Sequence, residues 1–283
     1  MMEIEILDAV RPHGGLSLIV LLLVIAEFTW LRFGERSGDS ARNYDLRESA
    51  ATGAILVGQL LMRSLTAFVL APVYFRVAEH AIMRIEMSSA LSWVALLLVV
   101  DLAYYWFHRL SHQVAWLWAT HAVHHSSTRF NLSAAYRLGW TNLISLGWLF
   151  FLVPILIGFP PAAVAGMLSA NLTYQIFLHT CVVGRLGPLE WVFNTPAHHR
   201  VHHAVNESCR DRNFGGVLIV FDRLFGTFAE APHGETLRYG TVDTLAGYNP
   251  FAIAFSGWLR LIERARAARS FAGVLRVTLG RPR

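Results

Sequence analysis

A bilayer-length apolar run leads directly into a histidine pair: Met87-Ser-Ser-Ala-Leu-Ser-Trp-Val-Ala-Leu-Leu-Leu-Val-Val-Asp-Leu-Ala-Tyr-Tyr-Trp-Phe107, then His108-Arg-Leu-Ser-His112. A helix needs roughly 20 apolar residues to cross the hydrocarbon core of a membrane. Residues at i and i+4 lie on one face of a helix, so the two imidazoles point the same way. The sequence therefore predicts a membrane-crossing helix that carries metal-ligand chemistry at one end.

Four further apolar stretches have similar lengths, at residues 15–31, 50–75, 141–159 and 161–183. The last two are joined by Gly158-Phe-Pro-Pro161, and proline cannot continue a helix by donating its N–H. This junction predicts a tight hairpin, which either crosses the membrane or only dips into it. Charged residues make up 15% of the chain, against ~25% in an ordinary soluble domain. We predict an all-α, polytopic membrane protein of about four to five transmembrane helices.

The basic residues predict how the chain is oriented in the membrane. All 24 are Arg, and the short loops place seven of them on the side that carries the histidines and three on the other. Cytoplasmic loops carry the excess of Arg and Lys. We therefore expect an integral, multi-pass protein of a bacterial inner membrane, with a histidine-rich helical cap facing the cytoplasm. The Arg residues form no stripe with interleaved aromatics, so we expect no nucleic-acid partner.

Ten of the 13 histidines fall in four places on that same side of the membrane. Two runs, His121-Ala-Val-His-His125 and His199-Arg-Val-His-His203, have the spacing i, i+3 and i+4, which lies on one helix face. Each run can therefore aim its imidazoles at one point. The ten are His108, His112, His121, His124, His125, His179, His198, His199, His202 and His203.

So many imidazoles in one pocket predict metal ions. They would repel one another if protonated, and neutral imidazole is a good ligand for Fe, Zn and Cu. One metal takes about four to six ligands, so this number suits two ions. A zinc protease would need a Glu within a pattern such as His-Glu-x-x-His, and none stands here. Iron with O₂ fits best, although the count of imidazoles does not exclude zinc.

The three histidine boxes resemble those of the membrane fatty acid hydroxylase and sterol desaturase superfamily. The likeness runs from Asp101 to Phe228 and includes Asn194-Thr-Pro-Ala-His-His-Arg-Val-His-His203 and Phe221-Asp-Arg-Leu-Phe-Gly-Thr-Phe228. It implies a di-iron oxygenase acting on a sterol, an acyl chain or an ether lipid. It also implies that nine of the ten histidines are ligands, with His198 either a ligand or a neighbour of one.

Within the superfamily, the alkylglycerol monooxygenase branch is similar in Asn131-Leu-Ser-Ala-Ala135 and Leu186-Gly-Pro-Leu-Glu-Trp191. That branch oxidises the ether-linked carbon of glyceryl ethers with a tetrahydropterin. It has Glu at two positions where this chain has Gln113 and Thr128. The chain has no Gly-x-Gly-x-x-Gly nucleotide loop, so electrons are expected from a separate reductase or carrier, or from a tetrahydropterin.

We predict three parts: N-terminal transmembrane helices at 1–85, a di-iron domain at 86–230, and a basic tail at 231–283. The tail either lies on anionic lipid as an amphipathic helix or packs on the core. Asp101 lies two helical turns before His108 on the same face, and we expect it to orient a ligand imidazole. The predicted reaction is hydroxylation of a lipid C–H. The alternatives are desaturation at the same site, or a non-enzymatic metal-binding or transport protein.

Overall fold

The computed structural model describes residues 14–33, 44–241 and 247–282. Within these residues every regular element is a helix, and the strand pairing is limited to the isolated bridges Phe193–Leu218 and Ala204–Tyr239. The all-α prediction is therefore confirmed. Of the basic tail, residues 242–246 and 283 lie outside the described part of the chain.

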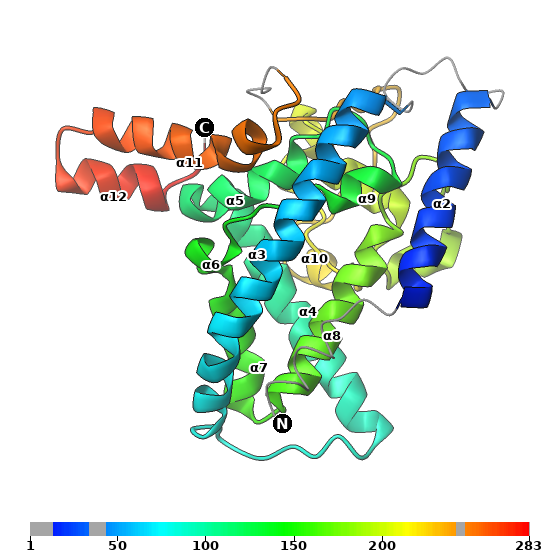
Figure 1. The fold of residues 1–283 in the computed structure, drawn as a ribbon. Helices are drawn as coiled ribbons and strands as arrows, with labels where there is room; N and C mark the ends of the chain where they lie inside the picture. The colour runs from blue at the N-terminus through cyan, green and yellow to red at the C-terminus, as the bar shows by residue number, and fades with distance from the viewer. Residues whose placement is uncertain (1–13, 34–43, 242–246, 283) are drawn as a thin grey trace.

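Two long helices form the frame of the molecule, α3 (Leu46–Ala78) and α4 (Ala90–Gln113) (Figure 1). Both are long and apolar enough to cross a membrane, which agrees with the apolar stretches at 50–75 and 87–107. The side chain of Asp45 caps α3, and Ser89 caps α4, by accepting N–H groups that have no partner within the helix. Helix α2 (Gly14–Phe33) stands at the side of this frame.

The stretch 141–159 is not one helix, which corrects the prediction of a continuous span. It consists of α6 (Asn142–Ser145), the 3₁₀ helix η2 (Gly147–Phe151) and α7 (Leu152–Ile157). Leu146 separates the first two with a left-handed backbone, φ 63°. The break lets Gly147 lie so close to the ring of Phe107 on α4 that a Cβ there would come within 2.3 Å of it.

The hairpin between α7 and α8 (Pro161–Ile176) reaches the far ends of the two long helices. The N–H of Ile82, in the connection from α3 to α4, donates to the carbonyl of Leu156 over 2.8 Å. The N–H of Ile85 donates to the carbonyl of Gly158, at the tip, over 3.0 Å. The tip of the hairpin therefore lies at the same depth as the turn between α3 and α4.

Short helices gather at the opposite end, where α4 runs into α5 (Ala115–His125). Two further helices, α11 (Pro250–Ala267) and α12 (Phe271–Leu279), form a pair that packs on α5 and projects sideways from the molecule (Figure 1). The remaining short elements at this end are η1 (Leu132–Tyr136), η3 (Gly187–Trp191), α9 (Pro196–His203), η4 (Glu207–Cys209) and α10 (Val220–Leu224).

Candidate metal centre

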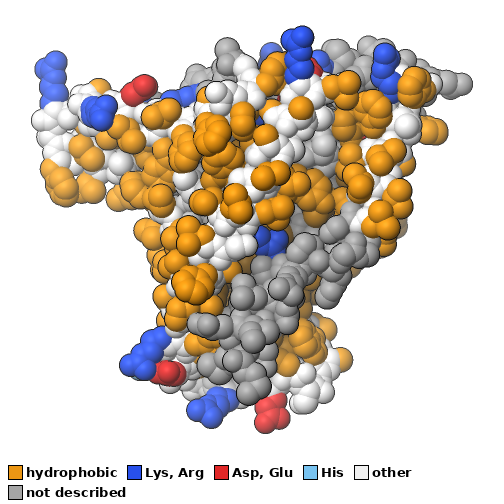
Figure 2. Space-filling view, viewed as in Figure 1, with side chains coloured by type: hydrophobic (Ala, Val, Ile, Leu, Met, Phe, Trp, Pro, Cys, Tyr) orange, Lys and Arg blue, Asp and Glu red, His pale blue; other side chains and the backbone are white. Residues whose placement is uncertain are grey.

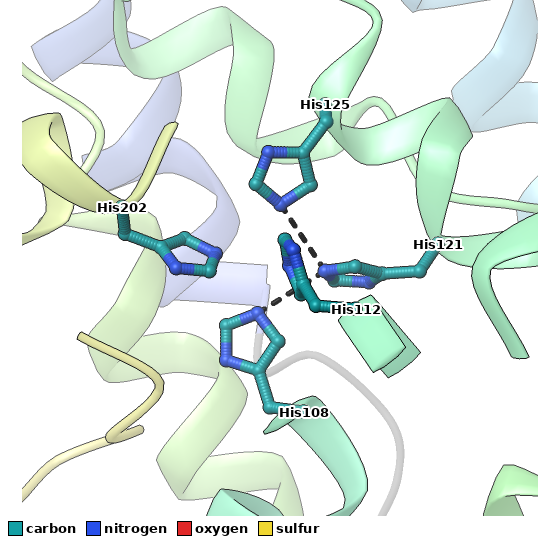
Figure 3. Close-up of side chains that lie close together, drawn as sticks. All are labelled: His108, His112, His121, His125 and His202. Carbon is teal, nitrogen blue, oxygen red and sulfur yellow. Dashed lines mark hydrogen bonds between the residues drawn. The ribbon is translucent and has the colours of Figure 1, made fainter. Parts of the chain in front are cut away.

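Nine of the predicted histidines form two compact groups at the upper ends of α4 and α8. Within each group the candidate ligand nitrogens all lie within 4.8 Å of one another. The five-histidine group, drawn in Figure 3, consists of His108, His112, His121, His125 and His202. The four-histidine group consists of His124, His179, His199 and His203.

Helical geometry explains how the ligands divide between the groups. Consecutive residues on a helix point about 100° apart, because a turn takes 3.6 residues. On α5, His125 therefore points into the five-histidine group while His124 points into the other. On α9, His202 and His203 divide in the same way. A His-His pair on each of these short helices can thus serve two neighbouring ions.

The nitrogen–nitrogen distances fit coordination shells. In the five-histidine group, Nε2 of His121 lies 3.1 Å from Nε2 of His108 and 3.2 Å from that of His125 (Figure 3). In the other group, Nε2 of His124 lies 3.2 Å from that of His179. A metal with metal–nitrogen bonds of ~2.1 Å would hold adjacent ligand atoms about 3.0–3.4 Å apart.

Backbone carbonyls fix the tautomer of three of these imidazoles. Nδ1 of His108 donates to the carbonyl of Phe214 over 2.9 Å, and Nδ1 of His202 donates to that of Arg212 over 2.9 Å. Nδ1 of His179 donates to the carbonyl of Gln175 over 2.8 Å. A carbonyl can only accept, so each Nε2 keeps its lone pair for a metal.

Several histidine nitrogens also have no hydrogen-bond partner within the described structure, which fits a role as metal ligands. Buried nitrogens without any hydrogen-bond partner there include Nε2 of His112, His202 and His203. Unpaired buried polar atoms destabilise a fold, and a coordinated ion removes that cost. Burial also lowers the pKa of His124 to about 4 and that of His202 to about 3, which keeps these imidazoles neutral and able to coordinate.

The two carbonyls that orient His108 and His202 belong to one buried loop, residues 212–218, which we call the carbonyl loop. Between these carbonyls Asn213 has φ 57°, a left-handed conformation that Asn tolerates better than most residues. The carboxylate of Asp222 accepts the N–H of Phe214 and the N–H of Gly215, each over 2.7 Å. Sequence reasoning missed Asp222 as a site residue, because a carbonyl acceptor leaves no side-chain signal in the sequence.

Asp101 has a different place from the one expected. Its carboxylate accepts the amide of Asn171 over 2.6 Å and the N–H groups of Val217 and Leu218 over 2.9 and 2.8 Å. It therefore holds the far end of the carbonyl loop and bonds to no imidazole. The seven-residue separation from His108 explains this, since it amounts to about 10 Å along a helix at ~1.5 Å per residue.

His198 lies outside both groups. It precedes His199 on α9, so its ring points away from the groups and packs on Phe228, with ring centroids 5.3 Å apart. Its carbonyl accepts the amide of Asn213 over 3.1 Å, which ties α9 to the carbonyl loop. The structure therefore brings together nine of the ten predicted ligands.

A further buried carboxylate, Glu48 of α3, lies beside the segment that follows α5. It accepts the hydroxyl of Thr128 over 2.6 Å and pairs with Arg137 at 3.4 Å. Thr128 is one of the two positions at which the chain departs from the resembling branch. Sequence reasoning missed Glu48, because it lies 80 residues from Thr128 along the chain.

Residues 93–227 match the family model described as fatty acid hydroxylase. Alkylglycerol monooxygenase of Danio rerio is 38% identical over 252 residues, which cover 88% of this chain and 53% of that protein. The human alkylglycerol monooxygenase is 37% identical over 243 residues, covering 85% of this chain and 51% of that protein.

A bacterial relative is similar over a shorter stretch. Ornithine lipid hydroxylase OlsE of Rhizobium tropici is 30% identical over 154 residues, covering 53% of this chain and 45% of that protein. The chain thus spans about half the length of the curated relatives that it matches. No solved structure matches it.

Proposed function

Residues 93–227 belong to the fatty acid hydroxylase family, and on that premise we propose that the chain is a membrane-bound di-iron enzyme that uses O₂ to hydroxylate a lipid C–H bond. The observation that carries the proposal is the division of the histidines into two adjacent groups of five and four. Each group would hold one iron. Residues 86–230 form the unit that contains both groups.

The overall reaction converts R–H, O₂, two electrons and two protons into R–OH and water. Bound iron would supply the activation of O₂ and the removal of hydrogen from the C–H bond. The chain itself keeps the imidazoles oriented through the carbonyls of Gln175, Arg212 and Phe214. Most of the histidines of the two groups are buried, so the protein around them keeps water away from the site. Two electrons come from outside, from a reductase, a carrier protein or a tetrahydropterin.

The depth of the hairpin supports the proposed membrane placement. We assign crossings to α2, α3, α4 and the α7–α8 hairpin, which gives the four to five transmembrane helices expected from the sequence. The hydrogen bond from Ile85 to Gly158 at the hairpin tip supports a hairpin that crosses as deeply as α3 and α4. The excess of Arg in the loops at the histidine end supports a cytoplasmic site in a bacterial inner membrane.

The substrate is a membrane lipid, and ether lipids are the first class to test. The relatives named alkylglycerol monooxygenase support this choice, at 37–38% identity. A relative named ornithine lipid hydroxylase supports hydroxylation over desaturation as the outcome.

The test supplies ¹⁸O₂ to cells that make the protein, followed by mass spectrometry of extracted lipids. A lipid that carries one ¹⁸O, and is absent from cells making the His124→Ala variant, is the expected result. An unlabelled alkene as the sole enzyme-dependent product would instead identify a desaturase. No lipid change in cells whose protein carries its metals would favour a metal-binding or transport protein.

A further inference from the structure

The C-terminal pair α11–α12 is anchored firmly to the helix that supplies three metal ligands. One face of α11 is buried, and it carries Ile253, Ala254 and Leu261. At Gly257 the two helices meet so closely that a Cβ would lie 2.3 Å from the carbonyl oxygen of Ala119 on α5. The pair therefore packs tightly against α5.

Two hydrogen bonds also hold the pair to the core of the protein. The N–H of Ala115, at the start of α5, donates to the carbonyl of Gly280 just beyond α12 over 2.8 Å. The indole N–H of Trp258 on α11 donates to the hydroxyl of Thr141 over 2.8 Å. The projecting direction of the pair is thus set by the core of the protein.

From this base α11 and α12 project sideways, across the direction of α3 and α4 (Figure 1). We call the pair the arm. Its exposed large apolar side chains recur at intervals of three or four residues, which places them on one face of each helix. They are Phe251, Phe255, Leu259 and Ile262 on α11, and Phe271, Leu275 and Leu279 on α12. Figure 2 shows hydrophobic side chains gathered along the arm, with basic side chains at its upper edge.

The apolar face of the arm continues the apolar outer surface of α3. The indole N–H of Trp140 donates to the carbonyl of Ile55 on α3 over 2.8 Å. Its ring also contacts the rings of Phe251 and Phe255, with centroids 5.2 and 6.0 Å apart. Farther along α3, Leu61 is 66% exposed. One apolar surface therefore turns from the length of α3 onto the arm.

The charge of the arm favours an anionic partner. Residues 247–282 contain six Arg and a single acidic residue, Glu263. On α11, Arg260 and Arg264 lie off the apolar face, and Arg266, four residues after Ile262, lies at its end. Anionic headgroups attract Arg residues of a helix whose apolar face enters the membrane interface.

We propose that the arm is a membrane-surface element that lies among the headgroups of an anionic leaflet, with its apolar face toward the acyl chains. This proposal rests on the proposed function, in which α3 and α4 cross the membrane. Because α11 is fixed to α5, the arm sets the depth at which His121, His124 and His125 stand relative to the bilayer surface. A lipid of the same leaflet then lies beside the site.

The test uses photo-crosslinking of the full-length protein in vesicles that contain phosphatidylglycerol. The residue p-benzoylphenylalanine replaces Leu259 on the arm, Leu61 on α3, or Glu207, an exposed residue at the histidine end. The expected result is a lipid-sized mass increase for the Leu259 and Leu61 variants and none for Glu207. The lipid adduct at Leu259 should decrease in vesicles of phosphatidylcholine alone, because the Arg residues lose their anionic partners.

The control positions separate the two proposals. Lipid adducts at Leu61 but not at Leu259 would overturn the arm's docking and leave the membrane crossing of α3 intact. No lipid adduct at Leu61 would overturn the crossing itself. A Leu259 adduct with the mass of a second copy of the chain, or with another protein, would show that the apolar face is a protein interface instead.

Discussion

Asp222 accepts the backbone N–H of Gly215 over 2.7 Å, and the carbonyl of Phe214, in the same peptide group, accepts Nδ1 of His108 over 2.9 Å. One peptide unit therefore connects a buried carboxylate to a ligand imidazole. Hydrogen bonds in series polarise one another, so the carboxylate strengthens the carbonyl as an acceptor and makes the imidazole a better donor to a metal.

Asp222→Asn is expected to weaken metal binding at the five-histidine group. The carboxylate satisfies two N–H groups, from Phe214 and Gly215, whereas an amide offers one acceptor oxygen and adds two donors. Affinity should decrease by about 10–100-fold, as for other partners of metal-bound imidazoles. Titration of metal-stripped protein with Co²⁺, followed by visible absorption, measures it.

Asp211→Asn is the matched control for that variant. Asp211 is exposed and stands next to the carbonyl loop, so its replacement removes the same charge nearby without touching the loop's hydrogen bonds. It should leave Co²⁺ affinity unchanged. Equal effects of the two variants would mean that charge alone, and not the orientation of the loop, determines affinity.

Asp101→Asn is expected to affect both histidine groups. Asp101 holds the carbonyl loop, and it also accepts the amide of Asn171, whose oxygen accepts the amide of Gln175 over 2.6 Å. The carbonyl of Gln175 in turn orients His179. Metal affinity or activity should decrease by about 10–100-fold. Full metal content and activity in this variant would remove Asp101 from the support of the site.

Gly216→Ala is expected to destabilise the protein. A Cβ at this position would lie 2.6 Å from the side-chain oxygen of Asn171 and 2.7 Å from that of Asp101. Overpacking of this kind costs about 1–3 kcal/mol. The unfolding temperature in detergent should decrease. Gly166→Ala, on α8 with open space around its Cβ, is the control and should not lower it.

Sequence periodicity predicted the histidine sets because a helix repeats every 3.6 residues. The runs at 121–125 and 199–203 have this spacing, and both lie on helices. The pattern did not predict that adjacent histidines such as His124 and His125 would serve different groups. Consecutive residues on a helix point about 100° apart, but which group each imidazole joins depends on where α5 packs, which is a tertiary property.

Other features of the structure depend on tertiary contacts and could not be predicted from the local sequence pattern. The break at Leu146 lets Gly147 approach Phe107 on α4, a tertiary contact that the sequence of the apolar stretch does not reveal. The prediction for Asp101 considered the face of the helix but not the distance along it from Asp101 to His108. In the structure the carboxylate of Asp101 bonds to the carbonyl loop and not to an imidazole. The tail was predicted either to lie on lipid or to pack on the core, and α11 packs on the core with one face.

The two-group arrangement predicts how single ligand losses change metal content. Each group has enough imidazoles for one ion, so freshly made protein should carry about two metals per chain. His112→Ala removes a ligand of one group and His203→Ala a ligand of the other. Each variant should bind one of its two ions more weakly, so its metal content by mass spectrometry of the purified protein should fall below two. Their Co²⁺ spectra should differ, because each retains a different group.

His198→Ala supplies the comparison within α9, since His198 contacts Phe228 and belongs to neither group. It should keep about two metals, whereas removal of His124 and His202 together should abolish most metal binding and activity. Zinc in purified samples would not contradict iron in the cell, because Zn²⁺ binds such sites more tightly than Fe²⁺. Intact metal content and activity after the loss of both His124 and His202 would overturn the two-metal centre.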